Sequence, residues 1–142
     1  MANPLIAEFP TMGGKSSHHV EVMMSETPGF ACQFTFTADN RGVVIALQGK
    51  LDPEAVQELH PQVQEVYQAG VRRFVFDLND LTYLSSMGVR LLLGLRNQVK
   101  NEGRVALCRP SPTIMSLLET MKLTDIFPIY TDRDEAFAAI SQ

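Results

Sequence analysis

The sequence has few cysteines, no surplus of basic residues and no long apolar run, and each absence excludes a class of protein. Its two cysteines, Cys32 and Cys108, lie far apart and at no spacing typical of a metal site. We therefore expect buried free thiols in a reducing compartment. The formal net charge of −4 argues against nucleic-acid binding, because proteins that grip the phosphate backbone carry a basic surplus. No window approaches the roughly 18 consecutive apolar residues of a membrane helix, which excludes direct membrane insertion.

The N-terminal region lacks the features of a targeting signal or a cofactor site. Its first thirty residues have no basic start, apolar core or small-residue cleavage pattern, so we predict a cytoplasmic protein. Gly14-Lys15-Ser16 resembles the end of a phosphate-binding loop, but Phe9 stands where that loop needs a glycine. His18-His19 has no third metal ligand nearby. No cofactor or metal is therefore expected. We interpret residues 1–32 as an extension, loosely ordered or docked on a partner, and residues 33–142 as one domain.

Beyond residue 32 the apolar pattern alternates between strand and helix periods. Strands are expected at 33–38, 43–47, 72–78, 105–108 and 127–130, the last at a sheet edge because of Pro128. Helices are expected to follow the second, third, fourth and fifth of these strands. The order β-β-α-β-α-β-α-β-α predicts an α/β fold, a mixed and mainly parallel β-sheet with helices packed on it.

Polar and proline residues mark the expected helix starts. Asp52 and Ser111 are the expected N-caps, with Pro53 and Pro112 at the first helical positions. Pro61 inside the first helix predicts a kink or a later helix start. The stripes expected to face the core are Val56, Leu59, Val63 and Val66, then Leu91, Leu92, Leu95 and Val99, then Ile114, Leu117, Leu118 and Met121.

The most informative stretch is residues 75–90. A buried strand is expected to reach a polar turn at Asn79-Asp80, and Ser85-Ser86 then stands where a long apolar helix begins. A hydroxyl at such a position can help hold an anion, act as a nucleophile or accept a phosphate, and it can also simply cap the helix.

A nucleophilic role for these serines fits poorly. The nucleophile elbow of hydrolases reads Gly-x-Ser-x-Gly, and Leu84 replaces its first glycine. The hydrolase order also needs a histidine after the serine, whereas His18, His19 and His60 all precede it. We therefore predict no catalytic residue and no enzyme activity.

Two segments resemble the STAS domain, which occurs in anti-sigma factor antagonists and in the cytoplasmic tails of sulphate transporters. They are Gly49-Lys50-Leu51-Asp52 and the run from Phe76 to Leu93, and the likeness extends over about residues 33–140. In the antagonists the turn reads Asp-Ser-Ser/Ala-Gly, and its first serine is phosphorylated by a partner anti-sigma kinase. Aligned on Gly88, that serine corresponds to Ser86, the aspartate to Ser85 and the small third residue to Met87.

The resemblance implies a non-enzymatic interaction module that regulates transcription through a partner switch. The implied partner is an anti-sigma factor that is also a serine kinase, and a phosphatase and a second copy of the chain are further partners that the family allows. Ser86 is the expected phosphorylation site and Ser85 the second choice. The residues expected to contact the partner are Asp52, Tyr83, Ser85, Ser86, Met87, Gly88 and Arg90.

Alternatives within the resemblance stay open. The domain could be a scaffold or accessory subunit, as in stress-sensing complexes or a lipid-exporting ABC transporter. It could also bind a nucleotide or another small ligand without being phosphorylated. Separately, Arg90, Arg96, Lys100 and Arg104 could form a basic face or an ordinary solvated one.

Overall fold

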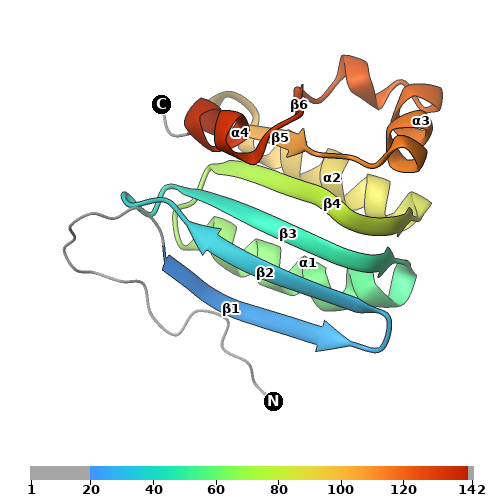
Figure 1. Ribbon diagram of the computed structural model, residues 1–142. Coiled ribbons are helices and arrows are strands. Elements are labelled where there is room, and N and C mark those ends of the chain that lie inside the picture. Colours follow the sequence, from blue (N-terminus) through green and yellow to red (C-terminus); the bar gives the residue numbers. More distant parts are fainter. Residues whose placement is uncertain (1–19, 141–142) are drawn as a thin grey trace.

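The protein forms one six-stranded β-sheet in which the strands lie in chain order (Figure 1). Its structure, a computed structural model, describes residues 20–140, with side chains described from Pro28 onward. The first three strands pair antiparallel and the remaining pairs are parallel. The strands are β1 (Val20–Thr27), β2 (Phe30–Phe36), β3 (Gly42–Leu51), β4 (Arg73–Leu84), β5 (Arg104–Cys108) and β6 (Ile129–Tyr130).

Helices cover the two faces of the sheet unequally. Right-handed crossovers that always step in the same direction place their helices on the same face. The three helices between the parallel strands accordingly share one face, and the last helix lies alone on the other (Figure 1). The helices are α1 (Pro53–Gln68), α2 (Ser86–Val99), α3 (Pro112–Thr120) and α4 (Arg133–Ile140), with short 3-10 turns η1 (Lys100–Glu102) and η2 (Leu123–Asp125).

The core follows the alternation of the central strands. In β3, Val43 and Ile45 pack toward α1, α2 and α3, while Val44 between them packs with Ala136 and Ile140 of α4. The mixed α/β fold predicted from the sequence is confirmed. The prediction of two buried free thiols is confirmed as well.

The predicted helix caps are also confirmed. The side chain of Asp52 accepts a hydrogen bond from the backbone N–H of Ala55 at 2.9 Å, and that of Ser111 accepts one from Ile114 at 3.2 Å. The later start proposed for α1 is wrong, because the helix runs from Pro53 through Pro61 to Gln68. Pro61 is exposed, so water can solvate the carbonyl that the proline leaves without a donor.

β4 is longer than predicted. The sequence indicated a turn at Asn79-Asp80, but the strand continues to Leu84. Its register against β3 shifts between Ala46 and Gln48 and again between Gly49 and Lys50. These bulges give β4 extra residues that interrupt the period-2 pattern, which is why the continuation was missed.

A strand also lies within the range interpreted as an extension. β1 occupies Val20–Thr27 and β2 begins at Phe30, three residues before the predicted start. A register shift between Glu21 and Met23 breaks the alternation of β1, so the sequence pattern gave no strand signal there. The division at residue 32 stays a prediction. The Gly14-Lys15-Ser16 and His18-His19 segments lie outside the described residues.

The end of α3 differs from its predicted stripe as well. Met121 is 38% exposed rather than buried, because α3 ends at Thr120 and Met121 caps it. Ile114 and Leu118 are buried as predicted. Within residues 20–140, no helix combines the length and the hydropathy needed to cross a bilayer.

Candidate functional site

The candidate site lies where β3 and β4 end side by side. Leu51 and Leu84 are paired at the last position of the parallel ladder, and α1 and α2 begin immediately after them. The arrowheads of β3 and β4 mark this edge on the right of Figure 1. The carboxyl edge of parallel strands is where α/β sheets commonly place functional residues.

Ser85 is the N-cap of α2 and ties the two strand ends together. Its Oγ accepts a hydrogen bond from the N–H of Gly88 at 3.1 Å and donates one to the carbonyl of Leu51 at 2.8 Å. Its own backbone N–H donates to the same carbonyl at 3.1 Å. With only 6% of its surface exposed, Ser85 has a structural role and its hydroxyl is engaged on both sides.

Ser86 is placed in the opposite way. It is the first residue of α2, it is exposed, and within residues 20–140 its hydroxyl has no hydrogen-bond partner. Tyr83 and Met87 beside it are 48% and 39% exposed, which makes them two of the three large apolar side chains exposed in the described structure. Together with the exposed Arg90 they form a surface that we call the Ser86 patch: Tyr83, Ser86, Met87 and Arg90.

Gly88 lets the start of α2 pack against the strand ends. A Cβ at this position would lie 2.9 Å from Leu51 Cδ2 and 2.9 Å from Leu84 Cδ1, closer than real Cβ atoms approach. A larger side chain would therefore require the ends of these two leucines, or the start of the helix, to shift. Gly88 is buried and supports the patch rather than extending it.

An apolar groove adjoins the Ser86 patch. It has a volume of about 440 Å³, lies between α1 and α2, and shares Met87 and Arg90 with the patch. Its lining residues are Val56, Gln57, His60, Pro61, Met87, Arg90 and Leu91. None of these described lining residues is a carboxylate. Asp52 is half-buried at the start of α1, with its carboxylate bonded to the helix backbone.

The structure does not gather the predicted basic residues on one face. Arg90 lines the groove near the start of α2, whereas Arg96, Lys100 and Arg104 line a separate cavity of about 440 Å³ beyond the other end of that helix. All four side chains are exposed. In the part of the chain with described side chains, no three His, Cys, Asp or Glu residues are placed to hold a metal ion.

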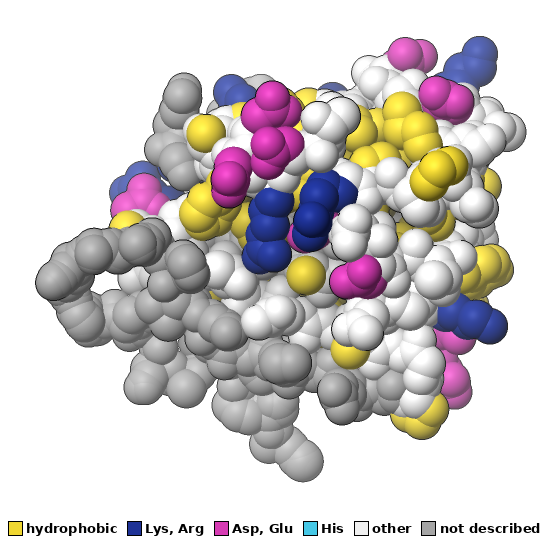
Figure 2. All heavy atoms as spheres, in the orientation of Figure 1, with side chains coloured by type: hydrophobic (Ala, Val, Ile, Leu, Met, Phe, Trp, Pro, Cys, Tyr) yellow, Lys and Arg dark blue, Asp and Glu magenta, His cyan; other side chains and the backbone are white. Residues whose placement is uncertain are grey.

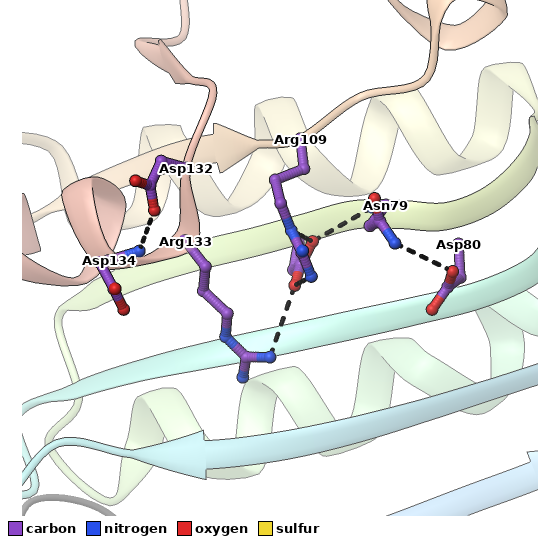
Figure 3. Close-up of polar contacts among 7 residues, drawn as sticks. Asn79, Asp80, Arg109, Asp132, Arg133 and Asp134 are labelled. Atoms are coloured by element: carbon purple, nitrogen blue, oxygen red, sulfur yellow. Dashed lines mark hydrogen bonds and ion pairs between the residues drawn. The ribbon is translucent and has the colours of Figure 1, made fainter.

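Sequence reasoning missed a charge cluster on the face of the sheet that carries α4 (Figure 3). Asp77 of β4 has only 3% of its side chain exposed and accepts from Arg109 through both oxygens, Nε–Oδ1 at 3.2 Å and Nη2–Oδ2 at 2.8 Å. Arg133 of α4 approaches the same carboxylate at 3.5 Å. Lys and Arg side chains, in dark blue, gather near the centre of the face shown in Figure 2.

This cluster joins β4, β5 and α4, so its role is structural. Burial, followed by the negative charge of Asp77, raises the pKa of the neighbouring Cys108 thiol to about 12. The hydrogen bonds to Asp77 raise the pKa of Arg109. The signal available in the sequence was an aspartate within an apolar strand, Phe76-Asp77-Leu78.

Known proteins share both the sequence pattern and the fold. Residues 33–136 match the family model of the STAS domain. A Bordetella bronchiseptica protein named as the anti-sigma factor antagonist BtrV is 33% identical over 100 residues, which cover 69% of this chain and 86% of that protein. The anti-sigma F factor antagonist of Lysinibacillus sphaericus is 33% identical over 79 residues, covering 54% of this chain and 68% of that protein.

Solved structures agree with these relatives. The anti-sigma factor antagonist SpoIIAA in its unphosphorylated form superimposes with a TM-score of 0.69 at 26% identity, covering 78% of this chain and 96% of that one. The phosphorylated form of SpoIIAA from Bacillus gives a TM-score of 0.62 at 26% identity, covering 77% and 98%.

Proposed function

This chain belongs to the STAS domain family, and we propose that it is an anti-sigma factor antagonist that works by partner switching. In its unphosphorylated form it binds an anti-sigma factor and thereby relieves the inhibition of a sigma factor. The anti-sigma factor is also a serine kinase, and the phosphate that it places on Ser86 ends the complex.

The observation that carries this proposal is the contrast between the two adjacent serines. Ser85 is buried and holds the helix start, so its modification would break two hydrogen bonds at the strand ends. Ser86 is exposed at the first position of the helix, with its hydroxyl unengaged in the described structure. These contacts favour Ser86 over Ser85 as the phosphate acceptor.

The relatives support the proposed phosphate switch. The names of two relatives describe anti-sigma factor antagonists, and SpoIIAA has been solved in unphosphorylated and phosphorylated forms that both superimpose on this chain. A STAS domain of this fold can therefore carry a phosphate and keep its architecture.

The energetics allow a switch that changes binding without changing the fold. A phosphate adds about −1.5 to −2 charges at neutral pH, and the N-terminus of α2 favours such a charge by a few tenths to about 1 kcal/mol. The same charge buried against a partner without a cation costs several kcal/mol. Because about 1.4 kcal/mol changes affinity tenfold, even partial burial releases the partner.

The Ser86 patch and the adjoining groove are the proposed contact surface. Exposed Tyr83 and Met87 offer apolar area, and the groove beside them can receive a partner side chain. Aromatic residues, Met and Arg are the side chains enriched at protein interfaces. Ser85 and Gly88 contribute by fixing the geometry of this surface, and half-buried Asp52 caps α1, the helix that forms the other side of the groove.

We propose further that the domain catalyses no reaction and acts in the cytoplasm. Its family is a regulatory one, with no known enzyme class. Among the side chains that the structure describes, no histidine is hydrogen-bonded to the buried hydroxyl of Ser85 or to the exposed hydroxyl of Ser86, and an activated serine nucleophile needs such a base. Phosphoryl transfer would therefore come from the partner.

A small-ligand role is the second candidate. A cavity of about 590 Å³ lies at the carboxyl ends of β3 and β4 and is lined in part by Asn79, Asp80 and Ser111. Such an edge is the usual ligand position in α/β sheets. The carboxylate of Asp80 disfavours an anionic ligand there, so the partner switch is the better supported function.

The test compares Ser86→Asp with Ser86→Ala. The anti-sigma factor is first identified by affinity capture with phosphosite mapping, and its affinity for purified variants is then measured by calorimetry. We expect Ser86→Ala to bind as the wild type does and to resist phosphorylation, and Ser86→Asp to lose at least tenfold in affinity. A folded Ser86→Asp variant with full affinity would contradict the proposal.

A further inference from the structure

We infer that the guanidinium of Arg90 pairs with the phosphate on Ser86 of the same chain, so that phosphorylation adds negative charge to one residue of the contact surface and engages the cation of another. This inference rests on the proposed phosphorylation of Ser86. It assigns a positioning role to Arg90, which lies one helical turn after the serine.

The helix geometry brings the two side chains together. Residues four apart on an α-helix lie on the same face, with Cβ atoms about 5–6 Å apart. Helical side chains also lean toward the N-terminus. The long side chain of Arg90 is therefore directed back over the turn that begins with Ser86, whereas a residue of equal length on the N-terminal side would lean away.

Both groups are available for this contact. Ser86 and Arg90 are exposed, and within the side chains that the structure describes, Arg90 has neither an ion pair nor a hydrogen bond. Other cations are differently placed: Arg72, Arg109 and Arg133 are already paired with carboxylates. Pairing with a phosphate would therefore cost Arg90 no existing interaction.

The acidic residues at the start of α1 favour a cation beside Ser86. Asp52 caps α1 and Glu54 lies in its first turn, and both belong to the edge where α1 and α2 start. These carboxylates disfavour a second negative charge on the phosphate. A guanidinium can bind phosphate oxygens through two parallel hydrogen bonds, so Arg90 offsets this repulsion directly.

The pairing would also alter the groove. Arg90 supplies a cation to the groove in company with apolar Met87 and Leu91. When its guanidinium turns to the phosphate, the groove loses a charge that an acidic partner residue could otherwise bind. Phosphorylation would thus add an anion to the patch and occupy a cation of the groove at once.

The experiment uses the full chain with phosphoserine inserted at position 86 during translation, so that no kinase or partner is needed. The second pKa of the phosphate, near 6 when unperturbed, is followed by ³¹P NMR titration. We expect Arg90→Gln to raise this pKa by roughly 0.3 units relative to wild type, the size of a solvent-exposed i,i+4 ion pair. Arg90→Lys should restore part of the shift.

Two matched controls separate this contact from general electrostatics. Arg96→Gln removes a cation of the same helix that lies about 15 Å from Ser86 along the helix axis, and Lys50→Gln removes one at the end of β3. Both should leave the phosphate pKa at the wild-type value. High salt should abolish the difference between wild type and Arg90→Gln.

Equal pKa values in wild type and Arg90→Gln would overturn the inference, as would a shift of the same size in Arg96→Gln or Lys50→Gln. Neither result touches the proposed function, because release of the anti-sigma factor by phosphorylated wild type is measured separately. Loss of the pairing with intact release would therefore refute the role of Arg90 alone.

Discussion

Two glycines of α2 provide a direct test of how the start of this helix is held. Gly88 is packed against the strand ends, and an added Cβ would lie 2.9 Å from a carbon of both Leu51 and Leu84. Gly94 lies in the same helix, and apart from that helix's own nearby backbone nothing in the described structure lies within 4 Å of an added Cβ. Replacing glycine by alanine therefore favours the helical conformation at both positions, but the added methyl group approaches neighbouring side chains too closely only at position 88.

The expected changes in the free energy of unfolding have opposite signs at the two positions. Alanine is favoured over glycine inside a helix by about 0.5–1 kcal/mol, so Gly94→Ala should stabilise the protein by about that amount. At Gly88 the same gain is opposed by an overpacking cost of about 1–3 kcal/mol, because both leucines are buried and their close packing limits how far the side chains can shift. Gly88→Ala should therefore destabilise by up to about 2 kcal/mol.

The assay is urea denaturation followed by circular dichroism at 222 nm, with both variants and wild type measured side by side. Unchanged m-values would show that the shift reflects the folded state. Gly88→Ala should also weaken binding of the anti-sigma factor, since the displaced helix start carries Ser86. A Gly88→Ala variant as stable as Gly94→Ala would refute the close packing inferred here.

The remaining predictions concern the cap, the charge cluster and one thiol. Ser85→Ala should lower the free energy of unfolding by about 1–2 kcal/mol, because a helix cap and a buried hydrogen bond are lost. Ser86→Ala should change that free energy by less than about 0.5 kcal/mol. Equal effects of the two substitutions in urea denaturation would contradict the assigned roles. Asp77→Asn should lower the free energy of unfolding by about 2–3 kcal/mol in the same assay. This is somewhat less than the effect of breaking a fully buried ion pair, because the side chains of Arg109 and Arg133 are more than a third exposed. A variant with wild-type stability would refute this prediction. Cys108, whose pKa is raised to about 12, stays protonated at pH 8 and should resist iodoacetamide until the chain unfolds; mass spectrometry showing rapid native alkylation would contradict its burial.

The elements with local signals were predictable from the sequence. Asp52 and Ser111, each followed by proline, marked helix starts that the structure confirms. The apolar run around Phe76 identified a central strand. These signals depend on neighbouring residues alone, so a single sequence contains them.

Features that depend on distant residues were not predictable. The bulges that extend β4 past Asn79 depend on its pairing with β3. The ion pair of Asp77 with Arg133 requires α4 to cross the sheet. Which of Ser85 and Ser86 is buried depends on the contact with Leu51, because a shift of one position in the helix start would exchange their roles.

The order of the sheet has a consequence for how the protein is made. Since each strand pairs with the strand next to it in the chain, the sheet can grow in the direction of synthesis, and no late strand must insert between two earlier ones. Neighbour-to-neighbour pairing keeps each crossover shorter than in a sheet with skipped strands, and shorter loops favour faster folding. During synthesis on a ribosome, all residues of the Ser86 patch emerge with β4 and α2, before β5 and α4 are made.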